Sequence, residues 1–395
     1  MIKLLSKNLI YVYVLLWMLY FLQHMLMLKG IIAQSLFATV IAISFFAFLK
    51  VNVVYKAPVY LKWLNIMLLI LTIYGLVLII SGETMHKEYV NSVSKNYFYL
   101  QTLFQSILPI YAFYYFALRS QLSSKTINNL FLFILICNIL IFYQKHQMTS
   151  AHMNRDEITN NIGYFFVPLI MMLYVVTFKA IWKYLFMFIS FIFIMMSIKR
   201  GAILVGAIAA VSFMSYQMRR VTKKQVIYIV GLSITALYAA YKYIINLYET
   251  SSYFRVRIDR TLEGDSSGRD HIFLNLWSYF IDRSTLMEFL FGHGAAGTVR
   301  EFGRWAHNDW LEFAINQGLL GVMLYWVYWC VFVYEWWNYH GPREYQRALR
   351  DCIIVYFLVA IFSMSFNNMP LAASLCIGYC LAMNQRDKYM TDYAH

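Results

Sequence analysis

The chain has 395 residues, of which 61% are hydrophobic, 19% aromatic and only 13% charged. A soluble globular protein is about 45–50% apolar and about 25% charged, so this composition excludes a soluble enzyme. It also excludes a disordered chain, because disordered segments are polar and poor in aromatic residues. Composition therefore predicts a polytopic integral membrane protein of the all-α class, since helices satisfy their own backbone groups in lipid.

Apolar runs of about 17–25 residues can cross a bilayer as helices. Twelve runs approach this length, and the last two are short: Leu9–Leu28, Ile31–Leu49, Trp63–Ile80, Tyr97–Leu118, Ile127–Tyr143, Tyr164–Phe178, Trp182–Ile198, Gly201–Met218, Gln225–Ile245, Asp309–Tyr334, Cys352–Phe366 and Leu371–Met383. We therefore expect about 12 transmembrane helices, nine within residues 1–245 and three within residues 307–395.

The net charge of +14 comes from 33 Lys and Arg against 19 Asp and Glu. Much of the excess lies in short breaks between apolar runs, where it sets topology rather than binding nucleic acid. More of these basic residues fall inside when the N-terminus is cytoplasmic, so both termini are expected to be cytoplasmic. The five cysteines all lie in apolar runs, which indicates small buried hydrophobes rather than disulfides or a metal site.

Residues 246–306 form the only long hydrophilic stretch, which the topology places outside the cytoplasm as one large loop. Loops much longer than about 15 residues are usually functional or disordered. The sequence predicts an amphipathic helix here, on the membrane surface or docked on the bundle, because apolar residues recur at helical spacing. These residues are Ile272, Phe273, Leu276, Trp277, Phe280 and Ile281.

Lys199-Arg200 lies at an outer junction of two apolar runs, and Gly201 and Ala202 begin a series of small residues. Small residues let another helix approach closely. Arg200 is therefore expected at the outer mouth of a tightly packed helix. The alternative is that Arg200 only snorkels to the membrane interface.

Arg269 follows Ser266-Ser267-Gly268 at the start of the predicted amphipathic helix. The serines or Asp270 could cap this helix and leave Arg269 near its positive N-terminal end. A cation there is unfavourable unless an anion binds nearby, which makes Arg269 a candidate phosphate ligand. A salt bridge to a neighbouring acidic residue would explain it equally well.

His307-Asn308 precedes the tenth apolar run, where Asp309 and Glu312 have the spacing of a capping box. A helix N-terminus favours a neutral imidazole and an anion beside it. A neutral histidine among arginines suits glycosyl transfer to an alcohol from a phosphate leaving group. A purely structural role for His307 stays open, as do His293 and His271 as alternative bases.

These residues resemble two motifs of the O-antigen ligase and O-antigen polymerase superfamily of bacterial envelope glycosyltransferases. Arg200-Gly-Ala-Ile-Leu204 matches the family's Arg-x3-Leu motif. His307-Asn308, nine residues, Gly318, two residues and Gly321 match its His-[Asn/Ser/Gln]-x9-Gly-x2-[Gly/Thr/Tyr] motif after a periplasmic loop. The resemblance extends from about residue 190 to 335.

The resemblance implies a fold similar to GT-C-type glycosyltransferases, in the bacterial inner membrane with the active site facing the periplasm. It implies an inverting, metal-independent transfer of an undecaprenyl-pyrophosphate-linked glycan, without a cofactor. His307 would be the base and Arg200 the motif arginine, while Arg269 is our choice for a second pyrophosphate ligand. The alternatives to Arg269 are Arg304, Arg255 and Arg257. The residues expected to support the motif are Asn308, Asp309, Glu312, Gly318 and Gly321.

The expected partners are the lipid-linked donor, a glycan acceptor and membrane lipid, with a chain-length regulator as a candidate and no nucleic acid. We favour a polymerase, because a basic loop could hold two pyrophosphate-linked substrates. The alternatives are an O-antigen ligase that transfers to lipid A-core, and a lipid-glycan flippase.

Two further patterns favour other sites only weakly. Gly292–Gly297 matches GxGxxG, but no strand precedes it, so we expect a tight turn. A break in the apolar pattern holds His146, His152, Asp156 and Glu157, a weak signal for a metal site.

Overall fold

The protein is all-helical, as the composition predicted. The computed structural model describes residues 2–392 apart from residues 24, 29, 56, 83–96, 120, 154–158 and 263–268 and part of 221–247. Helices make up 83% of the structure, and the described part contains no strand.

The helices in chain order are α1 (Ile2–Phe21), α2 (Gly30–Val53), α3 (Val59–Ser81), α4 (Phe98–Leu118), α5 (Ser124–Met153), α6 (Gly163–Met172), α7 (Ala180–Met196), α8 (Arg200–Met218), α10 (Ser252–Leu262), α11 (Arg269–Ser278), α12 (Leu286–Phe291), α13 (Gly297–Phe302), α14 (Asp309–Trp337), α15 (Arg343–Phe362) and α16 (Leu371–Asp392). A π-helical turn (Tyr279–Arg283) follows α11, and a short 3-10 turn (Phe366–Asn368) precedes α16.

Five of the described helices, α2, α3, α5, α8 and α14, are long and apolar enough to cross a membrane. Leu69, Ile73 and Ile80 of α3 have exposed side chains, as expected of a surface that faces lipid. These helices are those of a membrane-embedded protein.

Two expected spans differ clearly from the structure, and a third is not tested by it. The run Tyr164–Phe178 forms only the short helix α6 followed by turns, and α15 begins nine residues before Cys352 and ends at Phe362. The run Gln225–Ile245 lies largely outside the described residues. Pro168 within α6 is consistent with the short helix, because proline removes a backbone donor.

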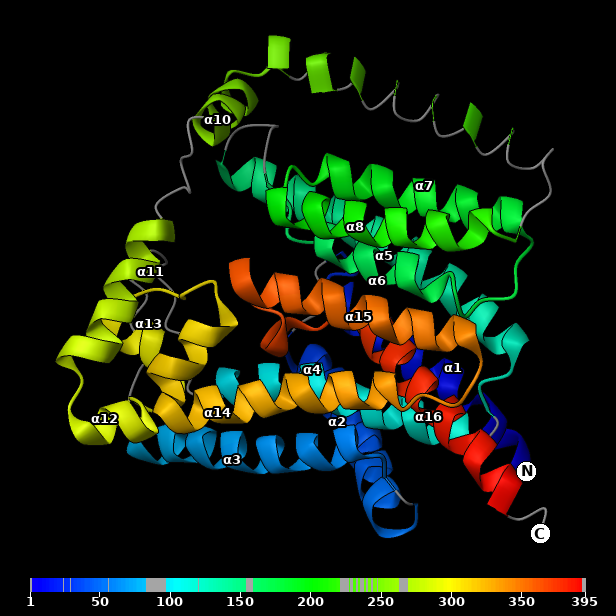
Figure 1. The fold of residues 1–395 in the computed structure, drawn as a ribbon, viewed down its shortest axis with the longest axis horizontal. Coiled ribbons are helices and arrows are strands. Elements are labelled where there is room, and N and C mark those ends of the chain that lie inside the picture. The colour runs from blue at the N-terminus through cyan, green and yellow to red at the C-terminus, as the bar shows by residue number, and fades with distance from the viewer. Residues whose placement is uncertain are drawn as a thin grey trace.

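Helix α4 lies at the centre of the bundle and packs against α16 and α2 (Figure 1). Its second half is buried on all sides, with Tyr111, Phe113 and Phe116 almost fully inaccessible to solvent. The short helices α11, α12 and α13 gather at one end of the bundle, while the start of α1 and the end of α16 lie at the other (Figure 1).

The predicted amphipathic helix exists and docks on the bundle through one face, to which Ile272 and Phe273 also belong. Leu276 and Phe280 are 2% and 5% exposed and pack in a small core with Leu311 and Ile315 of α14. Trp277, by contrast, is 56% exposed. The helix therefore covers the beginning of α14 with one face and leaves large apolar side chains on the other.

Candidate functional site

Helix α14 is interrupted at Gly318, which has φ 66° and ψ −157°. This conformation is essentially restricted to glycine. The close packing also requires glycine, because a Cβ atom here would lie 2.6 Å from the backbone nitrogen of Gly292. The break separates a nine-residue segment, residues 309–317, from the longer apolar part of the helix.

The GxGxxG segment packs against this break as a turn, as the sequence predicted. The N–H groups of His293 and Gly294 donate to the carbonyl oxygens of Ile315 and Asn316 at 2.8 and 2.9 Å. These carbonyls lose helical partners where α14 is interrupted, so the turn satisfies them. Backbone contacts thus fix residues 309–317 to the loop between α12 and α13.

The expected capping box of Asp309 and Glu312 is wrong, because Asn308 caps α14. Its side-chain oxygen accepts from the Leu311 N–H at 3.0 Å. Its side-chain nitrogen donates to the Ile361 carbonyl at the end of α15, at 2.7 Å. Asn308 therefore joins the start of α14 to the end of α15.

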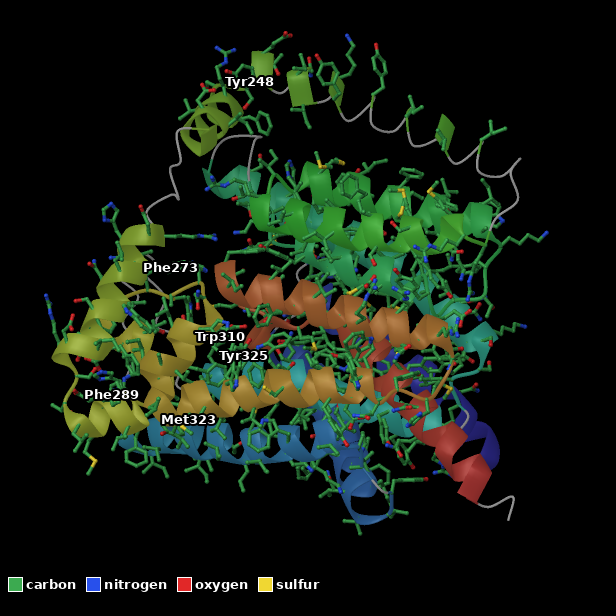
Figure 2. All side chains as sticks on the ribbon, viewed as in Figure 1. Tyr248, Phe273, Phe289, Trp310, Met323 and Tyr325 are labelled. Atoms are coloured by element: carbon green, nitrogen blue, oxygen red, sulfur yellow. The ribbon has the colours of Figure 1, made fainter. Side chains whose placement is uncertain are left out.

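Asp309 is 3% exposed and holds the turn that follows α15. One carboxylate oxygen accepts from the Ser365 N–H at 3.0 Å, the Ser365 hydroxyl at 2.6 Å and the Phe366 N–H at 3.1 Å. Tyr325 also donates to it, at 3.0 Å, and Tyr325 lies against Trp310 (Figure 2). The side chain of Asp309 therefore accepts hydrogen bonds from this distant turn and does not cap its own helix.

Glu312 is equally buried and holds the chain on the other side of His307. Its carboxylate accepts from the Thr298 hydroxyl at 2.6 Å, the Ala306 N–H and the Asn316 amide. A buried carboxylate with several donors fixes the segments that supply them. Asp309 and Glu312 thus position the backbone around His307 from inside the protein.

His307 has φ 52°, in the left-handed region that few non-glycine residues adopt. Ile198, beside Lys199, has φ 51°, which is rarer still for a β-branched residue. Such conformations cost about 1–3 kcal/mol each and cluster at functional sites. Both flank one cavity, since Lys199 and His307 line it.

The cavity has a volume of about 380 Å³ and lies between α4, α6, α8 and α15. Polar side chains line part of it: Asn161, Lys199, His307, Ser363, Ser365 and Asn368. Apolar ones line the rest, among them Val167, Val205, Val355 and Val359. Val205 is six residues beyond Lys199 along α8, or about 9 Å. The cavity therefore runs from a polar mouth into an apolar interior.

The imidazole of His307 faces positive charge. Its burial against the cavity walls, followed by the charges of Arg269 and Lys199, lowers the pKa of His307 from 6.5 to about 4. His307 as a whole nevertheless remains exposed to solvent, because it stands at the open mouth of the cavity. His307 is consequently neutral at physiological pH and able to accept a proton.

Arg269 begins α11 and donates to the Phe362 carbonyl at 2.6 Å. This carbonyl ends α15, where the helix dipole is negative. The contact therefore offsets the free-energy cost of placing a cation at the start of α11. From the sequence alone, we expected a bound anion or a salt bridge to offset this cost. One guanidinium nitrogen makes this contact, and the geometry holds the charge near His307.

Arg200 is the first residue of α8 and is partly buried beside Lys199. Gly201 allows the close approach that the small residues predicted, because a Cβ atom there would lie 2.2 Å from the Tyr164 hydroxyl and 2.7 Å from the Phe362 ring. The starts of α8 and α11 are thus both in contact with the end of α15.

The other predicted arginines do not join this group. Arg304 is exposed, and Arg255 donates to the Tyr248 and Glu249 carbonyls at 2.9 and 2.7 Å. Tyr248 lies well away from Trp310 at the start of α14 (Figure 2). The side chain of Arg257 lies outside the described residues.

The alternative bases are also placed elsewhere. His293 is packed in the glycine-rich turn, 3.8 Å from Glu288, and His271 is exposed on α11. The side chain of His152, together with Asp156 and Glu157 of the weak metal signal, lies outside the described residues.

The turn after α15 was not predicted from the sequence, yet it supplies Ser363, Ser365 and Asn368 to the cavity. Part of this turn was expected to belong to a membrane span that ends at Phe366. The polar run that begins at Ser363 was the available signal, because such a run is unfavourable in lipid. Lys199 was noted only as the neighbour of Arg200.

Neither the protein-family models nor the curated proteins give a match to this sequence.

Proposed function

We propose that the protein is a membrane glycosyltransferase that polymerises a surface polysaccharide such as O-antigen. Its donor is an undecaprenyl-pyrophosphate-linked glycan, and its acceptor is a sugar hydroxyl of another lipid-linked repeat unit. The observation that carries the proposal is that His307 and Lys199 lie together at the polar mouth of the cavity, where burial and the nearby charges of Arg269 and Lys199 lower the pKa of the imidazole.

In this reaction the acceptor oxygen attacks the anomeric carbon, and the bond from that carbon to the pyrophosphate oxygen breaks. His307 takes the proton of the attacking hydroxyl. Arg269 and Lys199, with Arg200 next to them, stabilise the negative charge that develops on the leaving pyrophosphate. The bound anion also raises the pKa of His307, which strengthens it as a base during turnover.

The form of the cavity supports an amphiphilic substrate. About 380 Å³ is within the usual range of ligand sites, about 300–1,000 Å³. The polar mouth suits sugar and pyrophosphate, and the apolar interior suits the first part of an isoprenoid chain. If His307 had only a structural role, neither its strained backbone nor the positive charges of Arg269 and Lys199 beside it would be required.

The test uses purified protein in liposomes with a lipid-pyrophosphate oligosaccharide, and compares His307→Asn with wild type. Asparagine tolerates a positive φ better than other non-glycine residues, so the backbone is preserved while the base is removed. We expect glycan elongation to fall about 10²–10⁴-fold. The matched control is His340→Asn, an exposed histidine after α14, which should keep full activity.

Three outcomes separate the alternatives. Elongation in His307→Asn at the wild-type rate would refute the proposed mechanism. Transfer only to lipid A-core would identify a ligase that uses the same groups. Translocation of the lipid-linked glycan without any new glycosidic bond would identify a flippase.

A further inference from the structure

A second cavity, of about 340 Å³, lies at the other ends of α8 and α15. Its lining includes Gln217 and Arg220 from the end of α8 and Glu344 from the start of α15. The 19 residues of α8 span about 28 Å, close to the roughly 30 Å thickness of a bilayer core. The polar mouth of the first cavity and the second cavity therefore lie at opposite ends of a helix that is about as long as the bilayer core is thick.

The second cavity has an excess of positive charge. Lys183 lines this cavity, and its side chain is half-buried. Among the described residues, no carboxylate lies within ion-pair distance of its amine. Arg220 pairs with Glu344 and stacks on the Tyr216 ring, 4.4 Å from its centroid. Within the described part of the chain, Glu344 is the only acidic residue in the lining, so one of the two positive charges of Lys183 and Arg220 is left uncompensated.

Two helices begin at this cavity and add to its positive potential. Lys179 and Pro342 are the N-caps of α7 and α15, and neither makes a side-chain capping hydrogen bond. Ala180, the first residue of α7, and Pro342, Glu344 and Tyr345 at the start of α15 contribute to the lining. Unpaired N–H groups at helix starts favour an anion, which here is placed next to Lys183.

The wall of the cavity is held in place by a buried carboxylate. The Tyr174 hydroxyl donates to Asp351 at 2.8 Å, and Ser212 and Arg350 donate to the same carboxylate at 3.0 and 2.7 Å. Asp351 is 2% exposed. Tyr174 lines the cavity, so its position is fixed without any ligand.

The surroundings of Lys183 indicate which kind of molecule would carry an anionic group into this cavity. Ile181 and Trp182, on the same turn of α7, are 54% and 51% exposed. Tryptophan is enriched where membrane meets water, and apolar exposure on this turn fits acyl chains. We propose that this cavity binds the phosphate of an anionic phospholipid headgroup, with Lys183 as the main cationic contact.

The test measures the binding and thermal stability of the purified protein in nanodiscs of phosphatidylcholine with or without phosphatidylglycerol. Phosphatidylglycerol should raise the Tm of wild type, and Lys183→Gln should weaken its binding about fivefold. Lys183→Arg keeps the charge and should bind as wild type does. The matched control is Lys125→Gln, an exposed lysine in the first turn of α5, which should leave binding unchanged.

Equal weakening in Lys183→Gln and Lys125→Gln would overturn the site, as would a Tm that does not respond to phosphatidylglycerol. A separate arm adds inorganic phosphate or glycerol phosphate in phosphatidylcholine nanodiscs. Protection by either soluble anion that matches phosphatidylglycerol would overturn the lipid assignment. Glycosyl transfer is not measured here, so failure of this proposal leaves the proposed function unaffected.

Discussion

The two ends of α8 and α15 hold cavities of similar volume that are built differently. At the His307 end, His307, Ile198 and Ala296 have positive φ, and the buried carboxylates of Asp309 and Glu312 fix the chain around the histidine. At the Lys183 end, helices begin regularly and a half-buried lysine faces the cavity. Strain is therefore concentrated at the end where we propose chemistry, as expected when a side chain must be aimed at a reacting atom.

The largest effect is expected from Gly318→Ala, which should damage only the His307 end. The added Cβ would clash with the backbone at Gly292, and alanine cannot easily adopt φ 66° with ψ −157°. We expect a loss of more than about 3 kcal/mol in stability, measured as a fall in Tm. Gly30→Ala, where a Cβ meets nothing within 4 Å, is the control and should be neutral. An unchanged Tm in Gly318→Ala would show that the break in α14 is not needed.

Arg269→Lys should have an intermediate effect, which we expect on glycan elongation at the His307 end and not on lipid binding at the Lys183 end. The guanidinium donates to the Phe362 carbonyl and has further donors for a ligand, whereas an ammonium does not reproduce this planar arrangement. We expect kcat/KM for elongation to fall about tenfold, with stabilisation by phosphatidylglycerol unchanged. Arg343→Lys, an exposed arginine at the other end of α15, should retain full activity. An equal fall of kcat/KM in Arg269→Lys and Arg343→Lys would contradict a specific role of Arg269 in the reaction.

The smallest effect is expected in the pH dependence of kcat/KM. The fall near pH 6.5 that is typical of a histidine base should be absent. A base must be unprotonated, and a pKa of about 4 keeps His307 neutral throughout the range from pH 5.5 to 8. The value of kcat/KM should therefore stay level over this range and fall only as the pH approaches about 4. The profile of kcat should fall at a higher pH, because bound pyrophosphate raises the pKa. A fall of kcat/KM centred near pH 6.5 would contradict the electrostatic environment of His307.

The sequence predicted the helical class and the glycine-rich turn, because composition and local residue types determine them. It failed at Asp309 and Glu312, whose spacing fits a local capping box. Asp309 instead binds Ser365, which is 56 residues away along the chain. Local spacing carries no information about such partners.

The sequence also placed Arg269 at the start of a helix but offered only an anion or a salt bridge as compensation. The structure supplies the Phe362 carbonyl, 93 residues away. The second cavity could not be predicted, since its lysine resembles any basic residue at a membrane boundary. The role of Arg200 as the family's motif arginine stays a prediction.

The contact between the glycine-rich turn and the break in α14 has a practical consequence for engineering. It is made of N–H groups, carbonyls and glycines, and the buried Thr298 of α13 adds its hydrogen bond to Glu312, so the exposed side chains of α12 and α13 take little part in it. Those two helices can therefore be given new surface residues while the backbone that carries His307 keeps its place.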